Sequence, residues 1–200
     1  MKLRVLGPKP IVPSLTVLCL VLFAPAGKIF AQQPGLDEFK NNLAPYVRSP
    51  EHAVDKMLDM ANLKPGETLY DLGCGDGNIL ITAAQRYKIQ AVGVEISGHL
   101  AKVAAENVKK AGLQQRVKIV HGNFMQTDLS NANVVTLYLA TTANESLRPN
   151  LERYLRPNTR VVSYDYPIPG WKAVNTAETQ SRSGATHTIY LYEVPNSIRK

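Results

Sequence analysis

The chain has 200 residues, 44% of them apolar and 20% charged, with 23 lysines and arginines against 16 aspartates and glutamates. This composition predicts one globular domain and excludes an intrinsically disordered chain. A net charge of +7 would normally suggest a nucleic acid or a membrane surface as partner. Residues 1–31, however, hold four basic residues and no acid, which leaves 19 basic against 16 acidic residues, or +3, for the rest. The surplus belongs mainly to the N-terminal segment, and we expect no nucleic-acid partner.

Residues 1–31 resemble a secretory signal peptide or an N-terminal anchor. Basic residues precede an apolar stretch over residues 11–25, and the small Ala31 stands before a polar segment. The apolar stretch is shorter than the roughly 20 residues that a spanning helix needs, and Pro13 interrupts it. We expect cleavage after Ala31, with an uncleaved anchor and a misassigned start codon as alternatives. The protein is therefore predicted to be exported or periplasmic, or anchored to the membrane by this segment.

The remaining chain divides into a linker over residues 32–48 and a main domain over residues 49–200, which we expect to be monomeric. Two cysteines are present, Cys19 and Cys74, so removal of the leader leaves no partner for an intrachain disulfide. The four histidines are scattered and none has the spacing of a zinc site. The fold is therefore expected to depend on its apolar core, without a metal.

Helices and strands are expected to alternate along the main domain. Ser49 is predicted to cap the first helix, Ser97 the third, and Pro149 to kink or interrupt the fourth. The expected helices cover residues 51–64, 78–87, 98–111 and 142–155, and the expected strands cover residues 68–70, 91–96, 117–120, 134–139, 160–163, 172–179 and 187–194. This order predicts an α/β fold with a doubly wound, mostly parallel, seven-stranded sheet and a C-terminal antiparallel hairpin.

A glycine-rich turn separates the first expected strand from the helix that follows it. Glycines at positions 73, 75 and 77 let the backbone approach a ligand closely. The N-terminus of the next helix adds free N–H groups and positive potential. This is the place where a doubly wound sheet binds nucleotides.

The residues around this turn do not fit a dinucleotide site. The third glycine of G-x-G-x-x-G would fall at position 78, which is Asn78. Asp71, at the end of the strand, is poorly suited to an anionic pyrophosphate. Its carboxylate suits a positively charged group, such as the amino group of a methionine moiety.

Two further strand ends carry side chains suited to a nucleoside. Glu95 ends the second strand, and a carboxylate there can accept both ribose hydroxyls. Asn123 and Phe124 follow the third strand, where an amide and an aromatic face can hold adenine. Three such positions at successive strand ends predict one ligand site.

These motifs resemble those of class I S-adenosylmethionine-dependent methyltransferases over about residues 68–194. The run Asp71–Gly77 together with Glu95 carries the resemblance, whereas Cys74 and Asn123 depart from the usual serine or threonine and the usual acid. The resemblance implies that S-adenosylmethionine is bound by Asp71, Gly73, Cys74, Gly75, Asp76, Gly77, Glu95, Asn123 and Phe124.

Further segments resemble one lysine methyltransferase family, namely residues 45–50, 147–155 and 159–171. Eukaryotic members of that family methylate lysines of mitochondrial membrane proteins, including the ATP synthase c-subunit and the adenine nucleotide carrier, and bacterial members also exist. The resemblance implies a Rossmann-like methyltransferase domain over residues 49–200 whose partner is a protein lysine, membrane proteins being among the candidates.

A lysine acceptor has to reach the methyl group uncharged, because its unperturbed pKa is about 10.4. Aromatic faces can hold the ammonium beforehand. The candidates are Tyr46, Tyr138, Tyr166 and Trp171, with Asp165 as the ammonium partner. We predict catalytic roles for Tyr166, Asp165 and Tyr46, and core packing is the competing interpretation of Tyr138.

Two other functions stay open on sequence grounds. A small-molecule methyltransferase is one, because a fold does not determine its substrate. A non-catalytic S-adenosylmethionine-binding module is the other, because the leader would remove the domain from the cytosol, where this cofactor is made. Methylation of base exocyclic amines is disfavoured, since residues 138–142 contain no Asn-Pro-Pro-Tyr or Asp-Pro-Pro-Tyr run.

Overall fold

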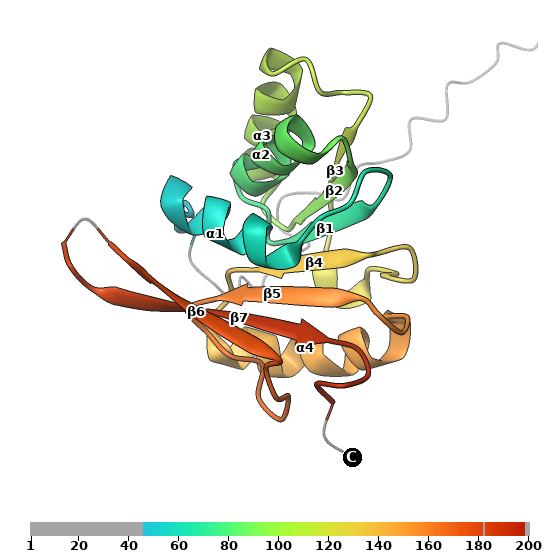
Figure 1. Ribbon diagram of the computed structural model, residues 1–200. Coiled ribbons are helices and arrows are strands. Elements are labelled where there is room, and N and C mark those ends of the chain that lie inside the picture. The colour runs from blue at the N-terminus through green and yellow to red at the C-terminus, as the bar shows by residue number, and fades with distance from the viewer. Residues whose placement is uncertain (1–45, 182, 199–200) are drawn as a thin grey trace, which may run out of the picture. The chain divides into compact units, whose positions relative to one another are not determined.

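A computed structural model describes residues 46–181 and 183–198 (Figure 1). The predicted leader, residues 1–31, and most of the predicted linker lie outside the described residues. Within the described part, no helix combines the length and the apolar character needed to cross a membrane.

Helices and strands alternate along the described chain much as predicted. The strands are β1 (Thr68–Leu72), β2 (Gln90–Glu95), β3 (Val117–His121), β4 (Val134–Leu137), β5 (Arg160–Tyr164), β6 (Asn175–Gln180) and β7 (Thr186–Glu193). The helices are α1 (Glu51–Ala61), α2 (Asn78–Tyr87), α3 (Gly98–Lys110) and α4 (Thr141–Tyr154), with a short 3₁₀ helix, η1 (Phe124–Gln126).

The strands form one seven-stranded sheet in the order β3-β2-β1-β4-β5-β7-β6. Strands β1 to β5 are mutually parallel, and β7 runs antiparallel to both β5 and β6. The predicted doubly wound sheet with a C-terminal antiparallel hairpin is confirmed. The chain moves outward in one direction from β1 to β3 and in the other from β4 to β5, so the strand order reverses between β1 and β4. In open α/β sheets, ligands bind beyond the carboxyl ends of the strands at such a switch point.

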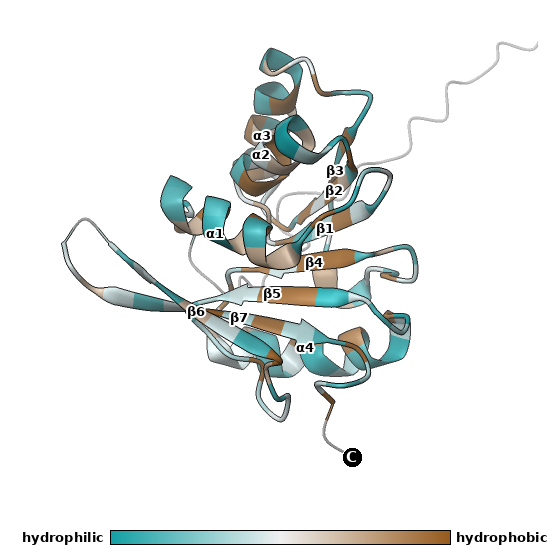
Figure 2. Cartoon of the chain, viewed as in Figure 1, coloured by the Kyte–Doolittle hydropathy of each residue, from teal (hydrophilic) through white to brown (hydrophobic). Residues whose placement is uncertain are grey.

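Both faces of the sheet are covered by helices, and each face has its own apolar core. Helices α1 and α2 pack on one face, where they enclose Val134 and Val162, while α4 covers the other face above Val135 and Val161. Figure 2 shows the resulting pattern, with apolar residues along β4 and β5 and polar residues on the outer surfaces of the helices. Strands that are buried on both faces have continuous apolar sequences, which explains the consecutive valines at 134–135 in β4 and 161–162 in β5.

Helix α1 ends at Ala61, three residues earlier than predicted, and the structure also differs from the predictions at Ser49 and Pro149. Pro50, not Ser49, occupies the N-cap position of α1, and the Ser49 carbonyl instead accepts a hydrogen bond from the Asn78 side chain at 3.1 Å. Helix α4 continues through Pro149, so the interruption that was one of the two expectations there does not occur. The predicted cap at Ser97 is confirmed, since its hydroxyl accepts a backbone N–H from the first turn of α3.

Gly93 in β2 has no room for a side chain. A Cβ atom there would lie 2.5 Å from Leu80 Cδ1 and 2.6 Å from Cys74 Sγ, whereas at Gly122 the nearest atom, Val120 Cγ1, is 3.7 Å away. We predict that Gly93→Ala lowers the free energy of unfolding by about 1–3 kcal/mol, the usual cost of overpacking, and that Gly122→Ala lowers it by much less. Urea unfolding of both variants measures the difference, and equal losses would contradict the packing argument.

Candidate active site

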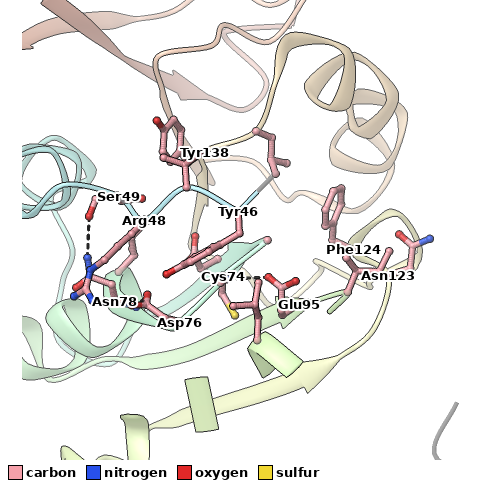
Figure 3. A pocket seen from close by; sticks show the side chains of 18 of the residues that line it. Tyr46, Arg48, Ser49, Cys74, Asp76, Asn78, Glu95, Asn123, Phe124 and Tyr138 are labelled. Atoms are coloured by element: carbon pink, nitrogen blue, oxygen red, sulfur yellow. Dashed lines mark hydrogen bonds and ion pairs between the residues drawn. The ribbon is translucent and has the colours of Figure 1, made fainter. Parts of the chain in front are cut away.

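A cavity lies beyond the carboxyl ends of β1, β2, β3 and β4, at the point where the strand order reverses (Figure 3). Eight of the nine predicted cofactor residues line it: Asp71, Gly73, Cys74, Gly75, Asp76, Glu95, Asn123 and Phe124. The ninth, Gly77, is not among the lining residues; it caps α2 in a left-handed conformation (φ 81°), and an added Cβ there would lie 3.4 Å from Ala104 of α3. The glycine-rich turn therefore supplies both the cavity wall and the helix packing behind it.

Asp71 is a buried acid without a cationic partner among the described residues. Its side chain is 3% exposed, and its Oδ1 accepts a hydrogen bond of 2.7 Å from the Thr136 hydroxyl on β4. Burial raises the pKa of this carboxyl to about 7; the charges of Glu95 and Asp76 add to the increase, and the Thr136 hydrogen bond opposes it. A carboxyl in this position fits a cationic group such as the amino group of a methionine moiety.

Glu95 is 6% exposed and is held by backbone donors on both sides. Its Oε2 accepts the Gly75 N–H and its Oε1 accepts the Ser97 N–H, each at 2.8 Å. The carboxylate is thereby fixed between the glycine-rich turn and the start of α3. Each oxygen keeps a lone pair free, so the group fits two ribose hydroxyls.

Asn123 and Phe124 lie at the end of the cavity opposite Arg48 and Ser49 (Figure 3). The Asn123 side-chain oxygen accepts the Met125 N–H at 2.9 Å and so caps η1. Its amide N–H groups remain available to a base, and the Phe124 ring lines the same end. These residues fit an adenine, although the asparagine oxygen is already used by its own turn.

Cys74 has no catalytic role in this arrangement. Burial raises the pKa of its thiol, and the charges of Asp71 and Glu95 raise it further, so the sulfur stays protonated. In the part of the chain that the structure describes, no cluster of three histidine, cysteine or acidic side chains could hold a metal ion.

Residues 46–49, mostly assigned to the linker by the sequence, form one wall of the cavity. Arg48 pairs with Asp76 at 2.9 Å, and the Tyr46 phenol has its pKa raised by burial and then by the charge of Asp76. The Tyr46 ring lies so close to Gly75 that a side chain at that position would collide with it. Figure 3 shows this ring projecting into the cavity. Sequence reasoning missed Arg48, because nothing local to it indicates a partner 28 positions away.

Four of the acceptor candidates follow the central strands, and the structure places them in different surroundings. They are Tyr138, Asp165, Tyr166 and Trp171. β4 ends earlier than predicted, and Tyr138 leaves the sheet to line the cavity. Asp165 and Tyr166 follow β5 and lie next to Tyr138, outside the cavity lining itself. Trp171 is the exception, since it is 7% exposed in the α4 core and its indole N–H donates to Glu152 at 2.9 Å. The suggestion that Trp171 binds the acceptor was therefore wrong, and it is a core residue.

The two buried acids lead to a direct binding test. We predict that Asp71→Ala and Glu95→Ala each weaken binding of S-adenosylhomocysteine by more than about tenfold, because each removes charge-assisted hydrogen bonds. Calorimetry with the exposed Glu106→Ala on α3 as control measures the effect. Unchanged affinity in both cavity variants would refute the site.

Because its pKa is raised, Asp71 lowers the free energy of unfolding of the ligand-free protein by an amount that depends on pH. Between its unfolded value of 3.8 and its folded value of about 7, the folded protein keeps a proton that the unfolded chain has lost. Stability is therefore lost as the pH rises through this window, by a free energy on the order of 4 kcal/mol. We predict that ligand-free Asp71→Asn gains stability over the wild type as the pH rises from about 5 to about 8. Urea unfolding at both pH values checks this, and a constant difference would contradict it.

Comparison with known proteins points to one family. A family model described as the ANTKMT methyltransferase domain matches residues 71–175. A protein-lysine N-methyltransferase of Saccharolobus islandicus is 44% identical over 151 residues, which cover 75% of this chain and 93% of that protein. The mouse adenine nucleotide translocase lysine N-methyltransferase is 28% identical over 166 residues, covering 82% of this chain and 70% of that protein.

Among solved structures, the chain is similar to a crystal structure titled as an RNA methyltransferase from Salinibacter ruber in complex with S-adenosyl-L-homocysteine. The two are 39% identical with a TM-score of 0.71, over 77% of this chain and 97% of that one. The family match, the strand order and the cavity at the switch point agree on the cofactor and the type of reaction. The chain belongs to the ANTKMT methyltransferase family and is an S-adenosylmethionine-dependent methyltransferase.

Proposed function

We propose that this enzyme methylates the side-chain amine of lysines in proteins. The observation that carries the proposal is the 44% identity to an archaeal protein named a protein-lysine N-methyltransferase, over nearly its whole length. The mouse relative is also named for a lysine of a protein substrate. The aromatic side chains of Tyr46 and Tyr138 at the cavity add chemical support, since aromatic faces attract ammonium groups.

The cavity residues have separate roles in holding the cofactor. Asp71 would bind the amino group of its methionine moiety, Glu95 the ribose hydroxyls, and Asn123 with Phe124 the adenine. When bound, the cofactor supplies a methyl group on a positively charged sulfur, which is already electrophilic. The protein therefore needs little acid–base machinery, and its contribution is to hold the acceptor nitrogen in line with that methyl group.

The acceptor lysine has to lose its proton before transfer. A partly desolvated position next to Tyr46 and Tyr138 lowers the pKa of an amine, because burial disfavours the charged form. The phenol of Tyr46 stays protonated, since burial and the neighbouring Asp76 raise its pKa. Tyr46 thus presents a neutral aromatic face and acts as no base.

RNA is the second candidate substrate, because the Salinibacter ruber relative is titled an RNA methyltransferase. Two features of this chain disfavour it. The charge outside residues 1–31 is only +3, and residues 138–142 lack the Asn-Pro-Pro-Tyr type of run that suits exocyclic amines of bases. A small-molecule amine is the third candidate.

The place of action, the kind of protein substrate and the oligomeric state are separate proposals, and the first depends on the sequence of residues 1–31 alone. We propose that this segment exports the domain or anchors it to a membrane, that a membrane protein is the substrate, and that the enzyme acts as a monomer. N-terminal sequencing of the native protein in each cell fraction tests the first part.

The predicted activity can be measured with a methyl-labelled cofactor. We expect the purified enzyme to label lysines of membrane-fraction proteins from cells lacking the gene, and the Asp71→Ala variant to label none. Total RNA and a metabolite extract serve as competing acceptors, and mass spectrometry locates the label. Label found only in RNA or metabolites, with no methyllysine, would overturn the proposal.

A further inference from the structure

A group of aromatic side chains adjoins the cofactor cavity at the ends of β4 and β5. Tyr138 lines the cavity; its ring packs edge-on against Tyr164 with centroids 4.7 Å apart, and stacks on Tyr166 at 6.4 Å. β4 and β5 are neighbouring parallel strands with Leu137 opposite Ser163, so their continuations meet at one edge of the sheet. The group therefore shares a wall with the cofactor cavity.

Asp165 lies at the apex of a strained turn within this group. Its φ is 67°, and the Tyr166 N–H donates to the Tyr164 carbonyl at 2.9 Å, which closes a three-residue turn. A γ-turn with positive φ is the strained form. The turn is held from both sides, because Asn144 of α4 donates to the Tyr166 carbonyl at 3.1 Å and the Ser163 hydroxyl donates to the same oxygen. Strained backbone that is held in this way clusters at ligand sites.

The partner of Asp165 comes from β7, which is adjacent to β5 (Figure 1). His187 Nδ1 lies 3.1 Å from Asp165 Oδ2, and the Asp165 N–H donates to the Thr188 carbonyl at 2.7 Å. Nδ1 is shielded from solvent and makes no hydrogen bond of standard geometry, so its contact with Asp165 is a close approach of the two groups. The imidazole faces the Tyr164 ring at 5.5 Å. Both side chains of the pair are about a quarter exposed, at 29% for Asp165 and 24% for His187. The carboxylate is thus confined on one side by the imidazole and partly open to solvent.

The charge of Asp165 also acts on the surrounding phenols. Burial raises the pKa of Tyr164 to about 12, with further contributions from Tyr138 and Asp165, and the pKa of Tyr138 is raised by burial and then by Asp165. The phenols of Tyr138 and Tyr164 therefore stay protonated. A carboxylate beside open aromatic faces attracts an organic cation.

We propose that Asp165, Tyr138 and Tyr166 bind the ammonium group of the acceptor lysine, and that His187 is a positioning residue that holds the Asp165 carboxylate for it. The assignment rests on the proposed lysine methyltransferase function. The imidazole limits the orientations open to the carboxylate, because its Nδ1 lies 3.1 Å from Oδ2. The ammonium is recognised at Asp165, and it loses its proton to solvent when it moves from there to the partly desolvated position next to Tyr46 and Tyr138, before it receives the methyl group.

Steady-state kinetics on a labelled protein substrate test the assignment. Asp165→Asn and His187→Ala are expected to raise the KM for the protein substrate by about tenfold or more, the size expected when a charge-assisted hydrogen bond is lost. His187→Asn, whose amide nitrogen can take the place of Nδ1 beside Asp165, is expected to recover most of that loss. The affinity for S-adenosylhomocysteine is expected to stay unchanged in all three, and the exposed Glu178→Gln on β6 of the same hairpin serves as control. An unchanged KM in Asp165→Asn, or equal losses in His187→Asn and His187→Ala, would overturn the assignment.

A second experiment separates this site from the proposed activity. In NMR titrations of the wild-type enzyme with S-adenosylhomocysteine, Nα-acetyl-lysine amide is expected to shift the His187 imidazole signals, and Nα-acetyl-norleucine amide to leave them unchanged. Lysine-specific shifts without methylation of any protein would support the site and overturn the proposed activity. Methylation of protein lysines with unaltered kinetics in the Asp165 and His187 variants would overturn the site alone.

Discussion

The buried carboxyl of Asp71 is the constraint on which the rest of this site depends. Thr136 provides it with one hydrogen bond, and no cation among the described residues compensates its charge. Such a group lowers the stability of the free protein at neutral pH, because burial favours the protonated form. A bound cation removes this penalty, so the free energy lost by the free protein is recovered as ligand affinity. Stability exchanged for binding in this way is common at functional sites.

The sheet topology places the other residues of the site around the Asp71 carboxyl. Because β1 pairs with β2 on one side and β4 on the other, the strand ends bring Glu95 and Tyr138 to the two sides of Asp71. The glycine-rich turn fits between them, and its Gly75 N–H fixes the Glu95 carboxylate. β5 then extends the same edge to Asp165, and β7 adds His187 from the antiparallel hairpin. The cofactor side and the proposed acceptor side are consecutive stretches of one sheet edge.

The sheet and the cofactor residues could be predicted because their signals are local. Apolar runs alternate with amphipathic stretches, and Asp71, Glu95 and Asn123 each end or follow a strand that the pattern locates within a few residues. The failures concern contacts between distant segments. His187 lies 22 positions from Asp165, and only the register of β7 against β5 brings them together.

Aromatic residues show the same limit of local patterns. Tyr138 lies within a predicted strand and Trp171 beyond one, and the sequence does not show which layer surrounds each. Tyr138 lines the cavity, whereas Trp171 fills the α4 core. Tyr46 was predicted from a resemblance, yet its contact with Gly75 depends on a segment that looked like a linker. For each of these aromatic residues, tertiary packing determines how buried the side chain is and which residue it contacts. Local sequence periodicity carries no information about either.

An NMR titration of the Asp71 carboxyl measures whether it binds a cationic group of the cofactor. We expect a pKa near 7 in the free enzyme, falling well below that value when S-adenosylhomocysteine is bound, because its amino group then stabilises the carboxylate. An Asp71 pKa that starts at about 3.8, or that does not change on binding, would show that Asp71 does not hold this group.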